Sequence, residues 1–287
     1  MMSIRLGLRV IGSSVGASHA WVPTRGFALT RVLNAKKKKE PSGDLSMVPI
    51  GSIGVMADFY VAPKVFKAPI SKWGRLLARR VIQFAVNTYS IAKYKRETKL
   101  KLEFNQWKET AMEQFVRTNK VFAAACNKRA SERKSYIERQ LNDCTGTEVI
   151  NQLAVRAATF PAGTKISWDL VSVDTNPKVI SFNALPDQNN LTAFIQFIVQ
   201  VTTTQKVTIT AANADPKETV RQVKDNLVFT LDPFAEEQRL VGSLFESDYD
   251  RKVQPDGSLI TPKTMLAFTK KCADIYRPNP QEIAASK

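Results

Sequence analysis

The pattern of apolar and polar residues changes its period near Pro161. Before this proline, apolar residues recur at helical spacing over residues 70–96 and 103–141, which predicts helices. A further helix, capped by Thr147 or its neighbour, is expected to end before Pro161. After Pro161, apolar and polar residues alternate, which predicts strands. The expected strand segments are residues 166–170, 179–182, 194–200, 207–209, 227–231 and 240–245.

Helices in the first half of the chain and strands in the second half indicate an α+β fold. We expect the N-terminal helices to pack on one face of a curved, mainly antiparallel sheet and to leave a cone or groove beside it. The composition agrees with a folded domain, since 44% of the 287 residues are hydrophobic and 24% are charged.

The first predicted helix, residues 70–96, is both basic and amphipathic. An amphipathic helix that carries basic residues together with aromatic ones is typical of membrane-surface elements. Trp73 and Phe84 are therefore candidates for insertion into a membrane. The alternative is a helix packed on its own domain, with a solvated basic face. The expected basic surface, which continues beyond this helix, consists of Lys72, Arg75, Arg79, Arg80, Lys93, Lys95, Arg96, Lys99 and Lys101.

The net charge of +16 is unevenly distributed. Residues 1–140 carry 27 Lys and Arg against 9 Asp and Glu, whereas residues 141–287 carry 15 against 17. A basic front on a nearly neutral body attracts polyanions, either the phosphates of RNA or the head groups of anionic lipid.

The N-terminal segment has the composition of a mitochondrial transit peptide. No acidic residue precedes Glu40, and Arg5 and Arg9 lie one helical step apart among apolar and small residues. We expect a transit peptide over residues 1–27, with cleavage near Phe27. Residues 28–66 are expected to form a basic flexible tether, whose four lysines at 36–39 serve either as a contact to nucleic acid or lipid or as a solubilising linker. Residues 67–287 are expected to form the α+β domain, which docks on its RNA or lipid partner.

The sequence lacks the residues that most catalytic chemistry requires. His19 is the one histidine in the chain, and it lies in the expected transit peptide. Cys126, Cys144 and Cys272 are far apart, which disfavours a zinc ribbon or a disulfide framework. No glycine-rich phosphate loop or dinucleotide fingerprint is found. We expect neither a cofactor nor a metal, and a binding protein instead of an enzyme.

The mature chain also lacks an apolar run of membrane-spanning length. The longest charge-free runs include residues 81–92 and 191–205. Both fall short of the roughly 20 residues that cross a bilayer. Any attachment to a membrane is expected to be peripheral.

Several short patches of the sequence, spread over residues 104–277, carry a resemblance to a known family. The clearest are Gly242, Ser243, Leu244, Phe245, Glu246 and Ser247, followed near the C-terminus by Asp274, Ile275, Tyr276 and Arg277. Trp107, Trp168 and the run from Pro177 to Ser181 occur at fitting distances. In their order and spacing these patches resemble the fungal mitochondrial inner-membrane ribosome receptor. That family is related to the C-terminal domain of the import-motor scaffold and to a mitoribosomal large-subunit protein.

The resemblance implies a cone-shaped helix-plus-sheet fold and a peripheral location on the matrix side of the mitochondrial inner membrane. It implies docking of the large mitoribosomal subunit near the polypeptide exit. It further implies cooperation with the Oxa-type insertase during co-translational insertion of nascent membrane proteins, beside anionic inner-membrane lipid. Two related interpretations stay open, a stoichiometric large-subunit protein of the mitoribosome and an import-motor scaffold subunit.

Overall fold

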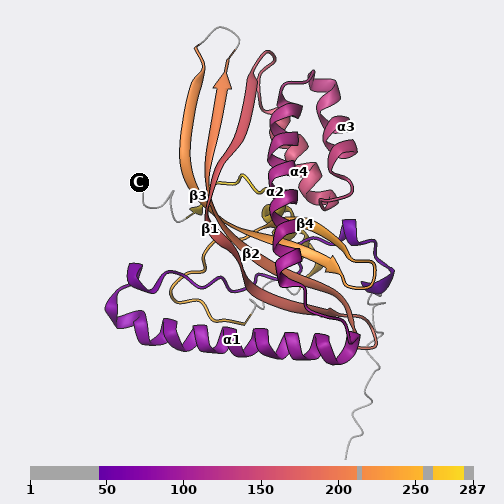
Figure 1. Ribbon diagram of the computed structural model, residues 1–287, viewed down its shortest axis with the longest axis vertical. Coiled ribbons are helices and arrows are strands. Elements are labelled where there is room, and N and C mark those ends of the chain that lie inside the picture. Colours follow the sequence, from indigo (N-terminus) through magenta and orange to yellow (C-terminus); the bar gives the residue numbers. More distant parts are fainter. Residues whose placement is uncertain (1–44, 212–214, 255–260, 281–287) are drawn as a thin grey trace, which may run out of the picture. The chain divides into compact units, whose positions relative to one another are not determined.

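The computed structural model describes residues 45–211, 215–254 and 261–280, which form an α+β domain (Figure 1). Four antiparallel strands make one sheet in the order β1-β2-β3-β4. The α+β prediction is therefore confirmed. The strands are β1 (Lys165–Pro186), β2 (Thr192–Thr210), β3 (Lys217–Asp232) and β4 (Glu237–Ser243). The helices are α1 (Ile70–Thr98), α2 (Phe104–Cys126), α3 (Ala130–Leu141), α4 (Thr147–Ala158) and α5 (Pro262–Ala273).

Helices α2 and α4 pack on one face of the sheet, and α3 packs on these two helices (Figure 1). The main core lies between these helices and the sheet, and it contains Trp107 of α2, Phe197 of β2 and Phe229 of β3. The Trp107 and Phe197 rings lie 5.8 Å apart, and so do the Phe197 and Phe229 rings. Buried aromatic pairs of this kind supply much of the packing energy of a core.

The opposite face of the sheet is also covered, although we expected helices on one face only. Val55, Phe59 and Val61 pack there with Ile198 and with Cys272 of α5. Ile198 follows Phe197 directly, and consecutive strand residues point to opposite faces. Because β2 is apolar on both sides, its second side requires a cover of its own.

The prediction of a flexible tether over residues 28–66 is wrong for the part that the structure describes. Ile50, Ile53, Val55 and Val61 of this segment are buried against the sheet. The prolines of the segment do prevent a long helix, but the chain packs in irregular form with short 3-10 turns at Leu45–Met47, Ile50–Ser52 and Val65–Lys67. Residues 28–44 of the expected tether and the expected transit peptide, 1–27, lie outside the described residues.

The helical sequence over residues 103–141 forms two helices, α2 and α3. The break falls at Asn127, whose side-chain amide pairs with the main chain of Ile166 in both directions, at 2.9 Å and 2.7 Å. Arg133, which is buried, donates to the carbonyl oxygens of Lys128, Ala157 and Phe160. These bonds join the ends of α2 and α4 to the start of α3.

The first four expected strands form only two. Residues 166–170 and 179–182 both belong to β1, and residues 194–200 and 207–209 both belong to β2.

Candidate functional site

Helix α1 turns polar side chains toward the domain between two buried apolar ones, Leu76 and Tyr94. Gln83 is buried, and its amide donates to the carbonyl oxygens of Tyr60 at 2.9 Å and Ile180 at 3.2 Å. Asn87 donates to the same Ile180 oxygen at 3.1 Å and accepts from the main-chain nitrogen of Phe182 at 3.2 Å. β1 is the outermost strand of the sheet, so these amides satisfy main-chain groups at its edge.

The outward side of α1 is also apolar. Val81, Phe84 and Tyr89 have exposed fractions of 68%, 71% and 69%. In an ordinary surface helix such residues face the core. A contiguous exposed patch of this kind marks a surface that contacts a membrane or another protein. The apolar face of α1, as we call it, consists of Ile70, Leu77, Val81, Ile82, Phe84, Val86 and Tyr89, all of them exposed.

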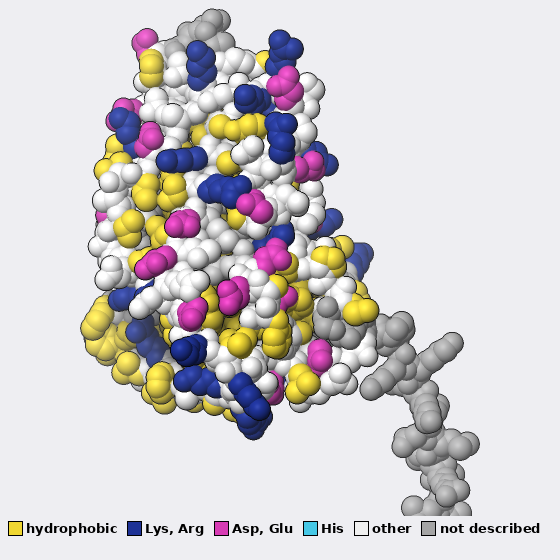
Figure 2. Space-filling model, turned by 45° about the vertical axis from the view of Figure 1, so that its right-hand side comes forward, with side chains coloured by type: hydrophobic (Ala, Val, Ile, Leu, Met, Phe, Trp, Pro, Cys, Tyr) yellow, Lys and Arg dark blue, Asp and Glu magenta, His cyan; other side chains and the backbone are white. Residues whose placement is uncertain are grey.

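This face lies at one end of the domain. Figure 1 shows α1 running along the lower end of the sheet and helices, and no other described helix or strand lies on its outer side. In Figure 2, apolar side chains in yellow and basic side chains in dark blue gather at the same end. No described helix is both long enough and apolar enough to span a membrane.

Four of the predicted basic residues are tied to the domain. Lys72 pairs with Asp250 at 2.5 Å. Arg79 donates to the main-chain oxygens of Tyr249 and Asp250, and Arg80 donates to that of Pro63 at 2.9 Å. The hydrogen bond from Lys72, together with the charges of Arg75 and Arg79, lowers the pKa of Asp250. Lys93 lies 3.4 Å from the side-chain oxygen of Asn190 and 4.0 Å from Glu97. These cations hold α1 in place.

The other predicted basic residues point into solvent. Arg75, Lys95, Lys99 and Lys101 are exposed, and they form no hydrogen bond or ion pair with the residues that the structure describes. Arg96 is exposed as well and lies 3.9 Å from Glu97. We call Arg75, Lys95, Lys99 and Lys101 the free cations of α1, although Lys99 and Lys101 follow its last residue, Thr98. They flank the apolar face at one margin and at its C-terminal end, where they can meet an anionic surface.

The two candidates for membrane insertion have different environments. The Trp73 indole donates to the main-chain oxygen of Ala68 at 2.9 Å, and its ring meets Phe66 edge-on at 5.5 Å. Trp73 also packs with Val65 and Leu76 in a small cluster, so it fixes the first turn of α1. Phe84 lies on the apolar face. Sequence periodicity missed the other members of that face, because it could not tell which side of the helix meets the domain.

The two clearest sequence patches of the resemblance pack against each other. The Arg277 guanidinium donates to the Ser243 main-chain oxygen at 2.6 Å and stacks on the Phe245 ring at 4.5 Å. A Cβ atom on Gly242 would lie 2.7 Å from the Cys272 main-chain oxygen, so this close approach requires glycine. These residues serve to build the fold.

The neighbouring residues of the same C-terminal patch are tied to α2 and α4. Asp274 pairs with Arg156 at 2.6 Å, and the Tyr276 hydroxyl lies 2.7 Å from Asn119. A signature built from such contacts identifies a family by its core and not by a reactive site.

The fold and the exposed face of α1 define a class, an α+β domain with an exposed apolar helix at one end. Residues 39–281 match the family described as MBA1-like protein, and the chain belongs to this family. Over 264 residues, which are 90% of this chain and 90% of the relative, it is 25% identical to "Inner membrane mitoribosome receptor MBA1, mitochondrial" of Saccharomyces cerevisiae. The family predicted from the sequence patches is confirmed, and the location named for this relative agrees with the expected mitochondrial inner membrane.

Proposed function

We propose that the protein is a peripheral receptor on the matrix side of the mitochondrial inner membrane, which holds the large mitoribosomal subunit near its polypeptide exit. The family and the named role of its yeast relative support the ribosome as partner. The observation that carries the membrane contact is the apolar face of α1 with the free cations beside it. From this position the protein would assist the Oxa-type insertase during co-translational insertion of nascent membrane proteins.

The free cations supply the electrostatic part of the attachment. Each Lys or Arg near an anionic leaflet contributes on the order of 1 kcal/mol. Arg75, Lys95, Lys99 and Lys101 together therefore contribute about 4 kcal/mol at low salt, and this contribution falls as salt screens the charges. The anionic lipid of the inner membrane is the expected counterpart of these residues.

The apolar face of α1 supplies the hydrophobic part of the attachment. Complete burial of one Val, Leu or Phe side chain is worth about 1.5–3 kcal/mol. A helix that lies in the interface buries its apolar side roughly 5–10 Å deep, between head groups and acyl chains. Insertion of a few of these side chains, added to the charge attraction, is sufficient for reversible attachment.

Vesicle flotation and ribosome sedimentation test the two halves of the proposal separately. The chain without residues 1–27 is mixed with vesicles containing an anionic lipid, with purified mitochondrial ribosomes, or with both. We expect binding to each, and bridging of ribosomes to vesicles when both are present. A folded protein that binds neither vesicles nor ribosomes at low salt contradicts the proposal.

We further propose that residues 1–27 are a transit peptide that is removed after import. The acid-free, arginine-containing composition of this segment supports the proposal. Mass spectrometry of the N-terminal peptide of the protein isolated from mitochondria should give a start near Phe27. A protein that retains Met1 in the matrix would contradict it.

A further inference from the structure

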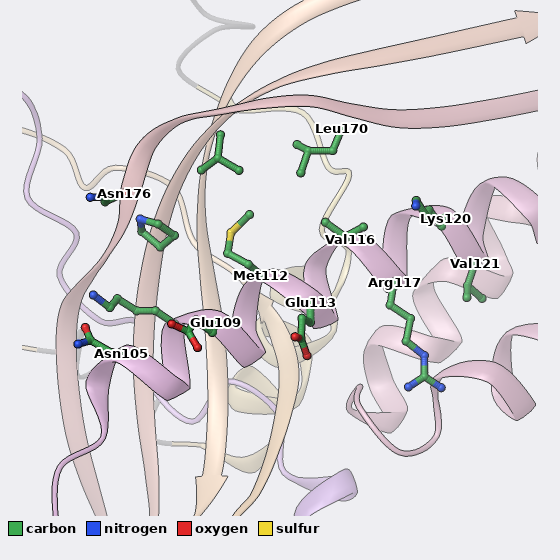
Figure 3. Close-up of a pocket in the computed structure, with 13 residues that line it drawn as sticks. Asn105, Glu109, Met112, Glu113, Val116, Arg117, Lys120, Val121, Leu170 and Asn176 are labelled. Carbon is green, nitrogen blue, oxygen red and sulfur yellow. The ribbon is translucent and has the colours of Figure 1, made fainter.

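A long groove runs between α2 and the outermost strand β1 (Figure 3). Its volume is about 950 Å³. Met112, Val116 and Val121 of α2 form one wall, and Leu170, Val173 and Pro177 of β1 form the other. Figure 3 shows Met112 and Val116 projecting from α2 toward Leu170. We call this feature the α2–β1 groove.

The apolar walls of the groove are only partly covered by the domain. Val173 is 45% exposed, and Met112, Val116 and Leu170 are half-buried at the margin of the main core. Methionine adapts its shape to different apolar partners more readily than branched residues do. An open apolar channel on the surface of a folded domain is typical of a binding site.

The charges along the rim nearly cancel. Lys108 and Lys120 are balanced by Glu109 and Glu113. The guanidinium of Arg117 is paired with Asp143, at 2.8 Å and 3.0 Å. The groove therefore attracts neither the phosphates of RNA nor anionic head groups, in contrast to the free cations of α1. An uncharged apolar occupant suits it best.

The groove is directed toward the end of the domain where α1 lies. Asn105 lines it near the start of α2, and Phe104 meets Phe182, the residue that pairs with Asn87 of α1. From there α2 leads away from α1 (Figure 1). With a rise of 1.5 Å per residue, the lining from Asn105 to Val121 extends over about 24 Å.

We propose that the α2–β1 groove holds an apolar, uncharged segment of a polypeptide that leaves the ribosome on its way to the membrane. This inference rests on the proposed receptor function. Such a segment contacts the apolar walls along its length, and the groove leads it toward the face that meets the bilayer. The groove length corresponds to about 16 residues in a helix, most of the roughly 20 residues that cross a bilayer.

The bound segment is helical and does not add to the sheet as a fifth strand. The register of β1 against β2 is interrupted between Leu170 and Ser172, between Val173 and Thr175, and between Thr175 and Lys178. Irregularities of this kind prevent regular pairing at a strand edge. A helix instead docks in an apolar groove through side chains spaced three and four residues apart.

Photocrosslinking tests this inference. A photoreactive amino acid replaces Val173 in the groove or, as control, Val155 on α4, which is a 63% exposed valine outside the groove. The protein is bound to mitochondrial ribosomes stalled with a 20-residue Leu- and Ala-rich segment outside the exit, or with a Ser- and Asn-rich segment of equal length. We expect crosslinks from position 173 to the apolar segment, reduced about tenfold for the polar one because apolar burial drives the contact.

Several other results of this experiment would overturn the inference. Equal crosslinks from positions 173 and 155, or equal crosslinks to both segments, would show that the groove does not select apolar chains. When anionic vesicles are added, crosslinks from position 173 to lipid alone would assign the groove to acyl chains. Ribosome binding is measured in the same samples, so that a silent groove on a bound protein contradicts this inference alone. Failure to bind the ribosome contradicts the receptor function as well.

A charge variant gives a second readout. Val173→Lys places a cation among apolar walls at a partly exposed position, where the fold tolerates it. We expect ribosome and vesicle binding to remain as in the wild type while crosslinking from a probe at Met112 to the apolar segment falls about tenfold. Val155→Lys is the matched control and should leave that crosslinking unchanged. Undiminished crosslinking in Val173→Lys would contradict the inference.

Discussion

The side-chain amide of Asn87 donates to the main-chain oxygen of Ile180 at 3.1 Å. This bond attaches α1 to the edge of the sheet by a polar contact, with Gln83 bonded to the same oxygen. Together with the buried side chains of Leu76 and Tyr94, these amides fix the inner side of the helix and leave the apolar face on its outer side. This pair of amides contributes to the orientation of α1, and with it to the candidate membrane contact.

Replacement of Asn87 should therefore weaken the domain. Asn87→Ala leaves the Ile180 oxygen with one donor fewer and the Phe182 nitrogen without its acceptor, at a cost of about 1–3 kcal/mol in the free energy of unfolding. Urea unfolding followed by circular dichroism measures it. Thr88→Ala, next in sequence but exposed, is the control and should change stability by less than about 0.5 kcal/mol. Equal stabilities of the two variants would show that the amide does not hold α1.

A charge on the apolar face should release the protein from membranes without unfolding it. Val81→Asp removes an apolar contact with lipid and brings a carboxylate to an anionic surface, so vesicle affinity should fall about tenfold or more. Val155→Asp changes an equally exposed valine on α4 and should bind like the wild type. Flotation with anionic vesicles compares them. Equal loss in both variants would mean that the position on α1 is not special.

Two arginines one turn apart on α1 should give opposite results. Arg75 is a free cation, whereas Arg79 donates to main-chain oxygens of Tyr249 and Asp250. Arg75→Gln should lower the affinity for anionic vesicles about fivefold, because one charge contributes on the order of 1 kcal/mol, and should keep the melting temperature. Arg79→Gln should lower the melting temperature instead. Reversed behaviour of the pair would contradict the assignment of their roles.

The half-buried carboxyl of Asp225 should make stability depend on pH. Burial raises its pKa to about 6, while the charge of Arg221 and a hydrogen bond from Gln205 oppose the rise. A folded-state pKa above the unfolded value near 4 means that the native protein binds more protons between these values. The stability from this group is complete below about pH 4 and is lost as the pH rises through about 6.

Asp225→Asn removes this titration. The variant should gain stability relative to the wild type at pH 7.5, on the order of 2 kcal/mol, and about half as much at pH 5. Urea unfolding at the two pH values gives the comparison. An unchanged difference between variant and wild type across this range would show that Asp225 does not titrate there.

The helix at residues 70–98 was visible in the sequence, but its orientation was not. Its apolar residues repeat at helical spacing, and this pattern suffices for the helix itself. Which side faces inward depends on the edge of β1, far away in the chain, where Gln83 and Asn87 find acceptors. Periodicity assumes that only the inner side is apolar. In α1 the inner side combines Leu76 and Tyr94 with buried amides, and the outer side is apolar as well.

The other differences have similar causes. The segment from Ile50 to Val61 was expected to be mobile because a charged, polar stretch precedes it and Pro49 and Pro63 flank it, yet its apolar residues cover the second face of the sheet. Helix α5 was not predicted from the sequence, although its start signal is recognisable. Thr261 caps this helix, and Pro262 occupies its first turn. Main-chain acceptors for Arg79 and Arg80 could not be foreseen, since they belong to loops that only the fold brings near.

Whether the apolar face of α1 enters a bilayer can be measured with an environment-sensitive fluorophore on a cysteine in place of Val81. The three natural cysteines are buried, and burial raises the thiol pKa of Cys126 and of Cys272 to about 11, so labelling should be selective. With anionic vesicles we expect blue-shifted emission at position 81, quenched by lipids that carry a quencher just below the head groups. The same label at position 155 should not respond. Unchanged emission at position 81 while the protein floats with the vesicles would contradict membrane attachment through α1.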